Sequence, residues 1–171
     1  MTINNIVIEI EGVDKSGKDT INPYITIITN YAYMVHCRGI LSQLVYNDKF
    51  YRNYDYTILY KPLVVFLDVS NDDHKIRCMI NNEPKININK DREAYYKYIE
   101  ELEKLNITVL KFNTSEKTPM QIAKEVNKYL KTIKAEDYFL DKPIIIKSLN
   151  FYNKNDLKDE DIFYEFKSEE N

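Results

Sequence analysis

The sequence predicts an α/β domain with a mainly parallel sheet. Short β-branched runs alternate along the chain with segments of helical periodicity, which is the pattern of strands joined by crossover helices. Residues 63–69 (LVVFLDV) are apolar almost throughout, as expected for a strand that helices bury on both sheet faces. A glycine-containing turn follows the first strand directly, at residue 12.

The first strand is expected at residues 6–10 (IVIEI), a short β-branched run that ends before Gly12. Residues 21–30 leave two alternatives open. Asn22 and Pro23 could cap and start a helix, with proline at its first position. The β-branched run 25–29 favours a strand instead.

The remaining elements alternate more clearly. Further strands are expected at 32–36, 63–69 and 107–112. Helices are expected at 39–52, 72–80 and 89–105, and from 115 or 118 to about 132 with Pro119 in the first turn. Two extended segments, 143–146 and 162–166, flank a polar loop near the C-terminus and could form an added hairpin or a partner-binding arm. We therefore expect a domain at 1–134 and a C-terminal extension at 135–171.

Composition excludes several classes of function. A length of 171 residues with 44% hydrophobic and 13% aromatic content fits one globular domain. The net charge of −3 gives no electrostatic case for nucleic acid or an anionic membrane as a partner. The two cysteines, Cys37 and Cys78, form no CxxC or disulfide pattern, and no signal segment is visible. We expect a cytoplasmic protein, in the host cytoplasm if a phage encodes it.

The motif that carries chemistry lies at residues 12–18, GVDKSGK, which match G-x-x-x-x-G-K directly after a strand. In such a loop the glycines permit a tight turn whose amide N–H groups converge on phosphate. The N-terminus of the following helix adds partial positive charge, and the lysine neutralises the β- and γ-phosphate oxygens. The alternative is an incidental glycine-containing turn, which the match of motif and context disfavours. The residues expected to bind nucleotide phosphates are Gly12, Val13, Asp14, Lys15, Ser16, Gly17, Lys18, Asp19 and Thr20.

Residues 8–18 (IEIEGVDKSGK) resemble the opening of thymidylate kinases and related deoxynucleotide kinases, which carry E-G-x-D-x-x-G-K-[ST]-T. Residues 36–46 (HCRGILSQLVY) resemble the D-R segment of that family with its S-x-x-x-Y continuation, and a looser likeness covers about residues 5–131. The resemblance implies the three-layer fold of P-loop NTPases of the nucleotide-kinase type, with ATP and Mg²⁺ as cofactors and a deoxynucleoside monophosphate as acceptor. It also implies that Asp14 contacts the sugar of the acceptor and that Lys18 and Arg38 act in catalysis.

The sequence departs from this family at four places. Position 19 is Asp where the family has a Ser or Thr that ligates Mg²⁺, and position 37 is Cys where it has an acid. Only about twenty residues separate the loop from Arg38, where the family uses several times that length to bind the acceptor. The lid, expected near 76–88, has Arg77 but no second arginine at the usual spacing, and Arg92 is the nearest candidate.

Asp19 can be interpreted in two ways. A carboxylate is a good oxygen ligand for Mg²⁺, so Asp19 is the candidate metal ligand. It also adds negative charge beside a triphosphate, where repulsion over a few ångströms costs on the order of 1 to 4 kcal/mol. We favour the interpretation that this position has decayed and that catalysis is impaired.

Other residues with reactive chemistry have ordinary interpretations. His36 and His74 are the only histidines, and nothing in the sequence places them together. His36 is expected to be packed or hydrogen-bonded. Cys37 could be a thiol whose pKa Lys18 and Arg38 depress, but a small packed residue is the favoured interpretation.

Two functions follow from these observations. The first is a nucleotide-kinase-like protein that binds a nucleoside triphosphate, and possibly a deoxynucleoside monophosphate, with impaired turnover. The second is a catalytically dead kinase fold that binds another protein, for example a host factor of a phage, or a second copy of itself. A tyrosine-rich stretch would suit such a protein-binding face: Tyr46, Tyr51, Tyr54, Tyr56 and Tyr60.

Overall fold

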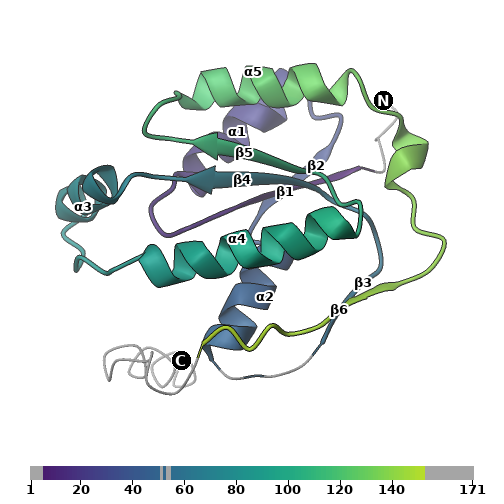
Figure 1. Ribbon diagram of the computed structural model, residues 1–171. Coiled ribbons are helices and arrows are strands. Elements are labelled where there is room, and N and C mark those ends of the chain that lie inside the picture. The colour runs from purple at the N-terminus through teal and green to yellow at the C-terminus, as the bar shows by residue number, and fades with distance from the viewer. Residues whose placement is uncertain (1–5, 51, 53–54, 153–171) are drawn as a thin grey trace, which may run out of the picture.

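The computed structural model describes residues 6–50, 52 and 55–152. Its centre is a four-stranded sheet in which all neighbouring strands are parallel, in the order β2-β1-β4-β5 (Figure 1). These strands are β1 (Val7–Gly12), β2 (Met34–Cys37), β4 (Leu63–Asp68) and β5 (Val109–Asn113). Because β1 and β4 occupy the centre, both are buried on both faces, as the continuous apolar run at 63–69 predicts.

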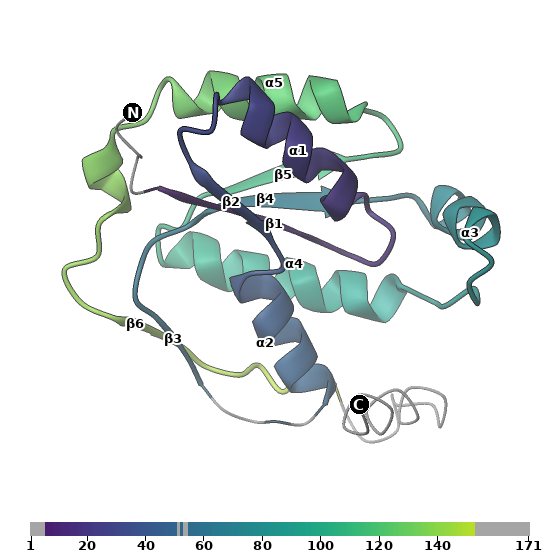
Figure 2. The same cartoon turned by 180° about the vertical axis from the view of Figure 1, so that it is seen from behind.

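Helices cover both faces of the sheet. α1 (Lys18–Ile28) and α5 (Pro119–Leu130) lie on one face, and α2 (Ile40–Lys49) and α4 (Asn89–Lys104) lie on the other (Figures 1 and 2). Alternating residues of β4 point to opposite cores, so that Val65 packs toward α1 and α5 while Phe66 packs toward α2 and α4. This arrangement confirms the predicted fold class: the chain has the three-layer fold of P-loop proteins of the nucleotide-kinase type.

The ambiguous segment 21–30 is helical, but the helix begins at Lys18 and not at Pro23. Gly17, the residue before the helix, has a φ of 93°. The helix therefore starts directly from the glycine-containing loop, and proline comes to lie inside it. Pro23 has no N–H to donate to the carbonyl of Asp19, and this costs little because Asp19 is exposed to water. Asn30 and Tyr31, both at positive φ, then turn the chain toward β2.

The chain passes from α1 to β2 through residues 29–33 alone. The acceptor-binding segment of the resembled kinases, which would lie between these elements, has no counterpart there. β2 consequently pairs directly with β1 and forms one edge of the sheet. α3 (Asn71–Ile80) lies beyond the carboxyl end of β4, at the same end of the sheet as the turn after β1 (Figure 1).

Segment 135–152 returns across the domain. A 3₁₀ turn (Ala135–Tyr138) leads to β6 (Ile144–Ile146), which pairs antiparallel with β3 (Tyr56–Ile58), a strand that the sequence analysis missed. The expected second extended segment, 162–166, lies outside the described residues. Residues of this returning segment contribute to both cores, with Tyr138 on the α1 side and Ile146 on the α2 side. The proposed boundary at residue 134 stays a prediction.

Helix length and polarity also bear on membrane insertion. Among the described residues, no helix combines the length and the apolar character that crossing a bilayer requires.

Candidate phosphate-binding site

The loop at residues 12–18 is shaped by two glycines. Gly12 ends β1 with a φ of 149°, and a Cβ atom there would lie 2.1 Å from the backbone oxygen of Leu67 in the neighbouring strand. Gly17 has a φ of 93° and precedes α1. Lys15 between them is also left-handed, with a φ of 55°. These conformations curl the backbone into a concave turn, which is the shape that the motif predicts.

The turn leaves hydrogen-bonding groups without protein partners. Gly17 provides no side chain to cap α1, so the amides of the first helical turn stay available to an anion. The hydroxyl of Ser16 is fully buried and has no hydrogen-bond partner among the described residues. Buried polar groups are normally paired, so the orphaned Ser16 Oγ indicates that the loop is completed by a further group.

Lys18 lies across the mouth of this turn. Its Nζ donates to the carbonyl oxygens of Gly12 and Val13, each at 2.8 Å, which holds the ammonium against the loop. Burial lowers the pKa of Lys18, and the positive charge of Arg38 lowers it further. An ammonium has three N–H donors, so one remains for a ligand.

Arg38 is held in a strained backbone conformation, with a φ of 63°. It follows β2 and lines the same cavity as Lys18. No hydrogen bond or ion pair engages its guanidinium within the described part of the chain. A free guanidinium facing a cavity is suited to an anionic ligand.

The turn that carries Arg38 is fixed by two glutamates of β1. Glu9 accepts a hydrogen bond from the amide of Ile40 at 2.9 Å, and Glu11 accepts one from the amide of Ser42 at 3.2 Å, so both carboxylates cap α2 from the neighbouring strand. Gly39 permits this contact, since a Cβ there would lie 2.2 Å from the Glu9 carboxyl group. Burial raises the pKa of Glu11 to about 7.

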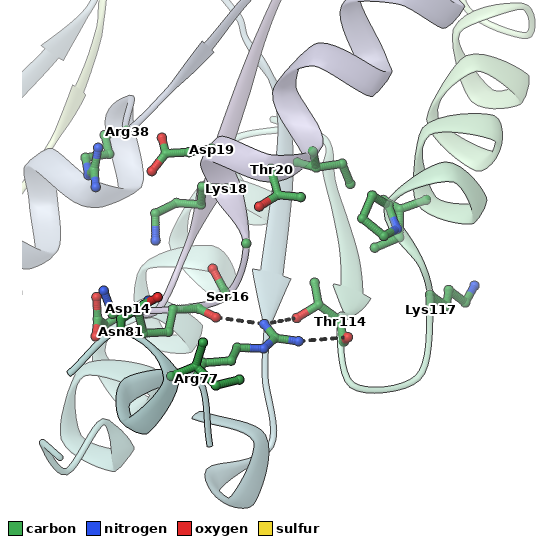
Figure 3. A pocket seen from close by; sticks show the side chains of 16 residues that line it. Asp14, Ser16, Lys18, Asp19, Thr20, Arg38, Arg77, Asn81, Thr114 and Lys117 are labelled. Atoms are coloured by element: carbon green, nitrogen blue, oxygen red, sulfur yellow. Dashed lines mark hydrogen bonds between the residues drawn. The ribbon is translucent and has the colours of Figure 1, made fainter. Parts of the chain in front are cut away.

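Arg77 of α3 joins the loop to the β5–α5 connection. Its guanidinium donates to the Lys15 carbonyl at 2.7 Å, and to the hydroxyl and carbonyl of Thr114 at 3.0 and 3.1 Å (Figure 3). Arg92, the nearest candidate for a second lid arginine, is not in this cavity. It pairs with Asp68 at 2.9 Å and lines a separate cavity at the end of β4. Arg92, which the sequence offered only as the nearest candidate, thus lies outside the cavity that Arg77 lines.

These groups surround one cavity of about 420 Å³ at the carboxyl edge of the sheet. Figure 3 shows Arg38 at one end, the loop with Lys18 in the middle, and Thr114 and Lys117 at the other end. Five basic and two acidic side chains line the cavity, whereas the whole chain has a net charge of −3. The local excess of positive charge favours anions.

The predicted loop residues from Asp14 to Thr20 and Arg38 all line this cavity, while Gly12 and Val13 form the floor of the turn through their carbonyl contacts with Lys18. The sequence analysis missed Asn81, Thr114, Lys117 and Pro119, which also line it. Thr114 and Lys117 lie in the connection after β5, and carboxyl ends of parallel strands meet at one edge. That rule is the signal that could have identified them.

Cys37 is a packed residue and not an activated thiol. Its Sγ lies 3.4 Å from the Lys18 carbonyl, and burial raises the pKa of the thiol. The alternative of a depressed pKa is therefore wrong. His36 lies 3.5 Å from the Glu9 carboxylate and is not among the residues that line the cavity, so its expected packed or hydrogen-bonded role stays a prediction. His74 contacts Asp14 at 3.4 Å, a proximity that the sequence did not reveal.

Three tyrosines of the tyrosine-rich stretch have contacts or a place within the domain. The Tyr60 hydroxyl donates to Glu9 at 2.6 Å, and Tyr56 lies in β3. Tyr46 stacks on Phe50. Tyr51 and Tyr54 lie outside the described residues, so a tyrosine-rich protein-binding face stays a prediction.

The sequence matches no protein-family model and no curated protein. Among solved structures, the YorR protein of Bacillus subtilis, in complex with phosphorylated GDP, is similar in fold with a TM-score of 0.56. The two chains are 18% identical, and the similarity covers 73% of this chain and 95% of the YorR chain. At this identity the likeness shows the fold.

Proposed function

We propose that the protein binds the phosphates of a nucleoside di- or triphosphate in the cavity above residues 12–20. The observation that carries this proposal is the position of the Lys18 ammonium, 2.8 Å from two carbonyls of a turn in which no described residue pairs with the Ser16 hydroxyl. Phosphate oxygens accept hydrogen bonds from such amides, hydroxyls and ammonium groups together. YorR, similar in fold, holds phosphorylated GDP, which agrees with a nucleotide ligand.

The shape of the cavity supports one orientation of the nucleotide. The phosphates would lie on the loop between Lys18 and Arg38, where the unpaired positive charge is concentrated. The nucleoside would extend toward Thr114 and Pro119, where the cavity wall contains Ile122 as well. Lys117 at that end already pairs with Glu125 at 2.5 Å, so it is less available to a phosphate.

A magnesium ion has one fitting protein ligand here. Asp19 lies in the first turn of α1, is exposed and lines the cavity. Mg²⁺ typically keeps several waters and uses one or two carboxylates together with substrate phosphates, so Asp19 would hold it in the presence of ATP. Thr20 also lines the cavity but stands one position beyond the hydroxyl of the resembled family.

We infer that phosphoryl transfer by this protein is severely impaired. Such transfer depends on positioning and charge neutralisation and needs both substrates held in line. The short α1–β2 connection provides no acceptor-binding segment, and Arg92 is engaged with Asp68. Lys18 and Arg38 remain as cations for a transferred phosphoryl group. The alternative of a kinase fold that binds another protein in a cytoplasmic setting stays a prediction.

Calorimetric titration with ATP, ADP, GTP and GDP, with and without Mg²⁺, tests the proposal. We expect at least one of these nucleotides to bind, and Lys18→Ala to weaken its binding about 100-fold because a charge-assisted hydrogen bond is lost. Lys124→Ala is the matched control, since Lys124 is exposed on α5 outside the cavity. This variant should bind the nucleotide with the affinity of the unmodified chain.

Two results would contradict these proposals separately. If the unmodified chain binds none of the four nucleotides, the phosphate site is refuted. If ATP is consumed with a deoxynucleoside monophosphate at roughly 1 to 100 turnovers per second, the usual range for kinases, impairment is refuted while binding stands.

A further inference from the structure

α3 buries an unusual pair of side chains. His74 and Cys78 are each 1% exposed and are the only buried residues of this helix. They are four positions apart and therefore lie on one face, one turn from each other. The large apolar side chains of the same helix point outward, with Ile76, Met79 and Ile80 being 52 to 74% exposed. The inward face of α3 is thus built from two metal-ligating residue types and not from apolar ones.

Asp14 of the phosphate-binding loop meets this face. Its Oδ2 lies 3.4 Å from Nε2 of His74, and the same Nε2 lies 3.6 Å from Sγ of Cys78. One ligand atom from each of the three residues lies within 4.8 Å of the other two. Among the described residues this is the one such group of three or more His, Cys, Asp and Glu side chains.

The distances among the three residues are compatible with a metal-ligand set. A hydrogen bond from nitrogen to oxygen is usually 2.7 to 3.2 Å long, so 3.4 Å is a poor bond for a buried histidine beside a carboxylate. Tetrahedral zinc, with bonds of about 2.0 Å to N or O and about 2.3 Å to S, separates its ligand atoms by about 3.3 to 3.6 Å. The two separations from His74 fall in that range, and the ligand atoms of Asp14 and Cys78 lie within 4.8 Å of each other.

The identity of the ligands selects the class of metal. Thiolate and imidazole ligands suit zinc and related transition metals, whereas Mg²⁺ and Ca²⁺ require oxygen ligands. Three protein ligands also leave one tetrahedral position for water. Asp14 is half-exposed at the wall of the nucleotide cavity, so an ion can reach the group from that side.

We propose that Asp14, His74 and Cys78 form a binding site for Zn²⁺ or a closely related transition-metal ion, which joins the phosphate-binding loop to α3. The site is distinct from the Mg²⁺ position at Asp19 and does not depend on nucleotide binding. Arg77, on the same helix, already donates to the carbonyl of Lys15. The ion and Arg77 would together hold two consecutive loop residues, Asp14 and Lys15, against α3.

Titration of the full, reduced and chelator-treated chain with Co²⁺ tests the site, because tetrahedral cobalt thiolates absorb strongly in the visible and near ultraviolet. We expect one Co²⁺ per chain, a thiolate-to-metal charge-transfer band, and displacement of that band by Zn²⁺. Cys78→Ser should abolish the band and weaken binding about 100-fold or more, since altering even the partners of metal ligands costs 10- to 100-fold. Cys37→Ser is the matched control and should retain the band, because Cys37 lies beside α1 and outside the group.

A second variant guards against misfolding of the first. Asp14→Asn alters a half-exposed loop residue and leaves α3 unchanged, and it should weaken Co²⁺ binding at least tenfold while circular dichroism stays that of the unmodified chain. The absence of a charge-transfer band in the unmodified chain would overturn the proposal. So would a band that survives Cys78→Ser in a folded variant, or Co²⁺ affinity that Asp14→Asn leaves unchanged.

Discussion

Gly12 and Gly17 of the phosphate-binding loop are restricted for different reasons. At Gly12 the backbone of β4 leaves no room, since an added Cβ would lie 2.1 Å from the Leu67 oxygen and 2.7 Å from the Ser16 hydroxyl. At Gly17 no atom of the described residues, apart from Gly17 and its two chain neighbours, lies within 4 Å of an added Cβ, so the φ of 93° is what resists a side chain. A motif written as two equivalent glycines thus contains one steric and one conformational requirement.

Gly12→Ala and Gly17→Ala should consequently differ in stability. We expect Gly12→Ala to lower the free energy of unfolding by at least about 3 kcal/mol, because overpacking adds to backbone strain. Gly17→Ala should lower it by about 1 to 2 kcal/mol, the usual cost of a left-handed non-glycine residue. Urea denaturation of both variants measures the difference, and equal losses would contradict the steric account of Gly12.

Residues of the loop were predictable because their pattern is local. Lys18 and the two glycines lie within seven consecutive positions directly after a predicted strand, and both the spacing and this context can be recognised in the sequence. Arg77 was expected near a lid, but its contacts with Lys15 and Thr114 depend on where α3 comes to lie. The same holds for His74, which meets Asp14 only because α3 is placed beside the loop.

β1 and α2 are coupled through buried carboxylates. A strand that is apolar on both faces should not carry two glutamates, yet Glu9 and Glu11 are almost completely buried in β1. They are tolerated because the N-terminal amides of α2 are directed at them and the partial positive charge of that helix end stabilises negative charge. The Ser42 hydroxyl adds a further hydrogen bond to Glu11. The amides of α2 that donate these hydrogen bonds come from residues 31 positions further along the chain, so the sequence alone does not reveal them.

Glu11 should make the stability of the fold depend on pH. Burial raises the pKa of Glu11 from 4.5 to about 7, so the folded state retains a proton that the unfolded chain releases above pH 4.5. The stabilising contribution of Glu11 is therefore complete below pH 4.5 and is lost as the pH rises to about 7. The difference in free energy of unfolding between the unmodified chain and Glu11→Gln should fall by about 2 to 3 kcal/mol across that interval.

Urea denaturation at pH 4.5, 6 and 7.5 measures this difference. Glu100→Gln is the control, because Glu100 is exposed on α4 and its substitution should give a difference that stays nearly constant with pH. A Glu11→Gln curve parallel to that of the unmodified chain would show that Glu11 titrates normally in the folded state.

At the scale of the whole molecule, the pairing of β3 with β6 joins the middle of the chain to the segment near the end of the described residues. β6 joins Tyr56, Thr57 and Ile58 from the middle of the chain to residues 144–146 near the end of the described chain. Ile146 enters the core between α2 and α4, whereas its neighbour Ile145 is 61% exposed. Tyr152, further along, donates to Asp91 of α4 at 2.6 Å. The segment from 135 to 152 is thus part of the packing of the domain.

Two adjacent isoleucines provide a matched test of this packing. Ile146→Ala should lower the free energy of unfolding by about 2 to 5 kcal/mol, because it removes a buried side chain and leaves a cavity. Ile145→Ala should cost less than about 1 kcal/mol, since the side chain is mostly in water. Thermal and urea unfolding compare the two, and similar losses would show that β6 does not pack as described.

By itself the sequence determined the alternation of strands and helices, the parallel sheet and the phosphate-binding turn, because each depends on hydrophobic periodicity or on residues close together in the chain. Only the tertiary structure decided that segment 21–30 belongs to a helix that starts directly after the loop. It further decided that Arg92 forms an ion pair with Asp68 and that β6 pairs with β3. It also decided that Asp14, His74 and Cys78 meet. The physical reason is that these contacts join residues distant in sequence, so they stabilise the chain only once the layers have packed.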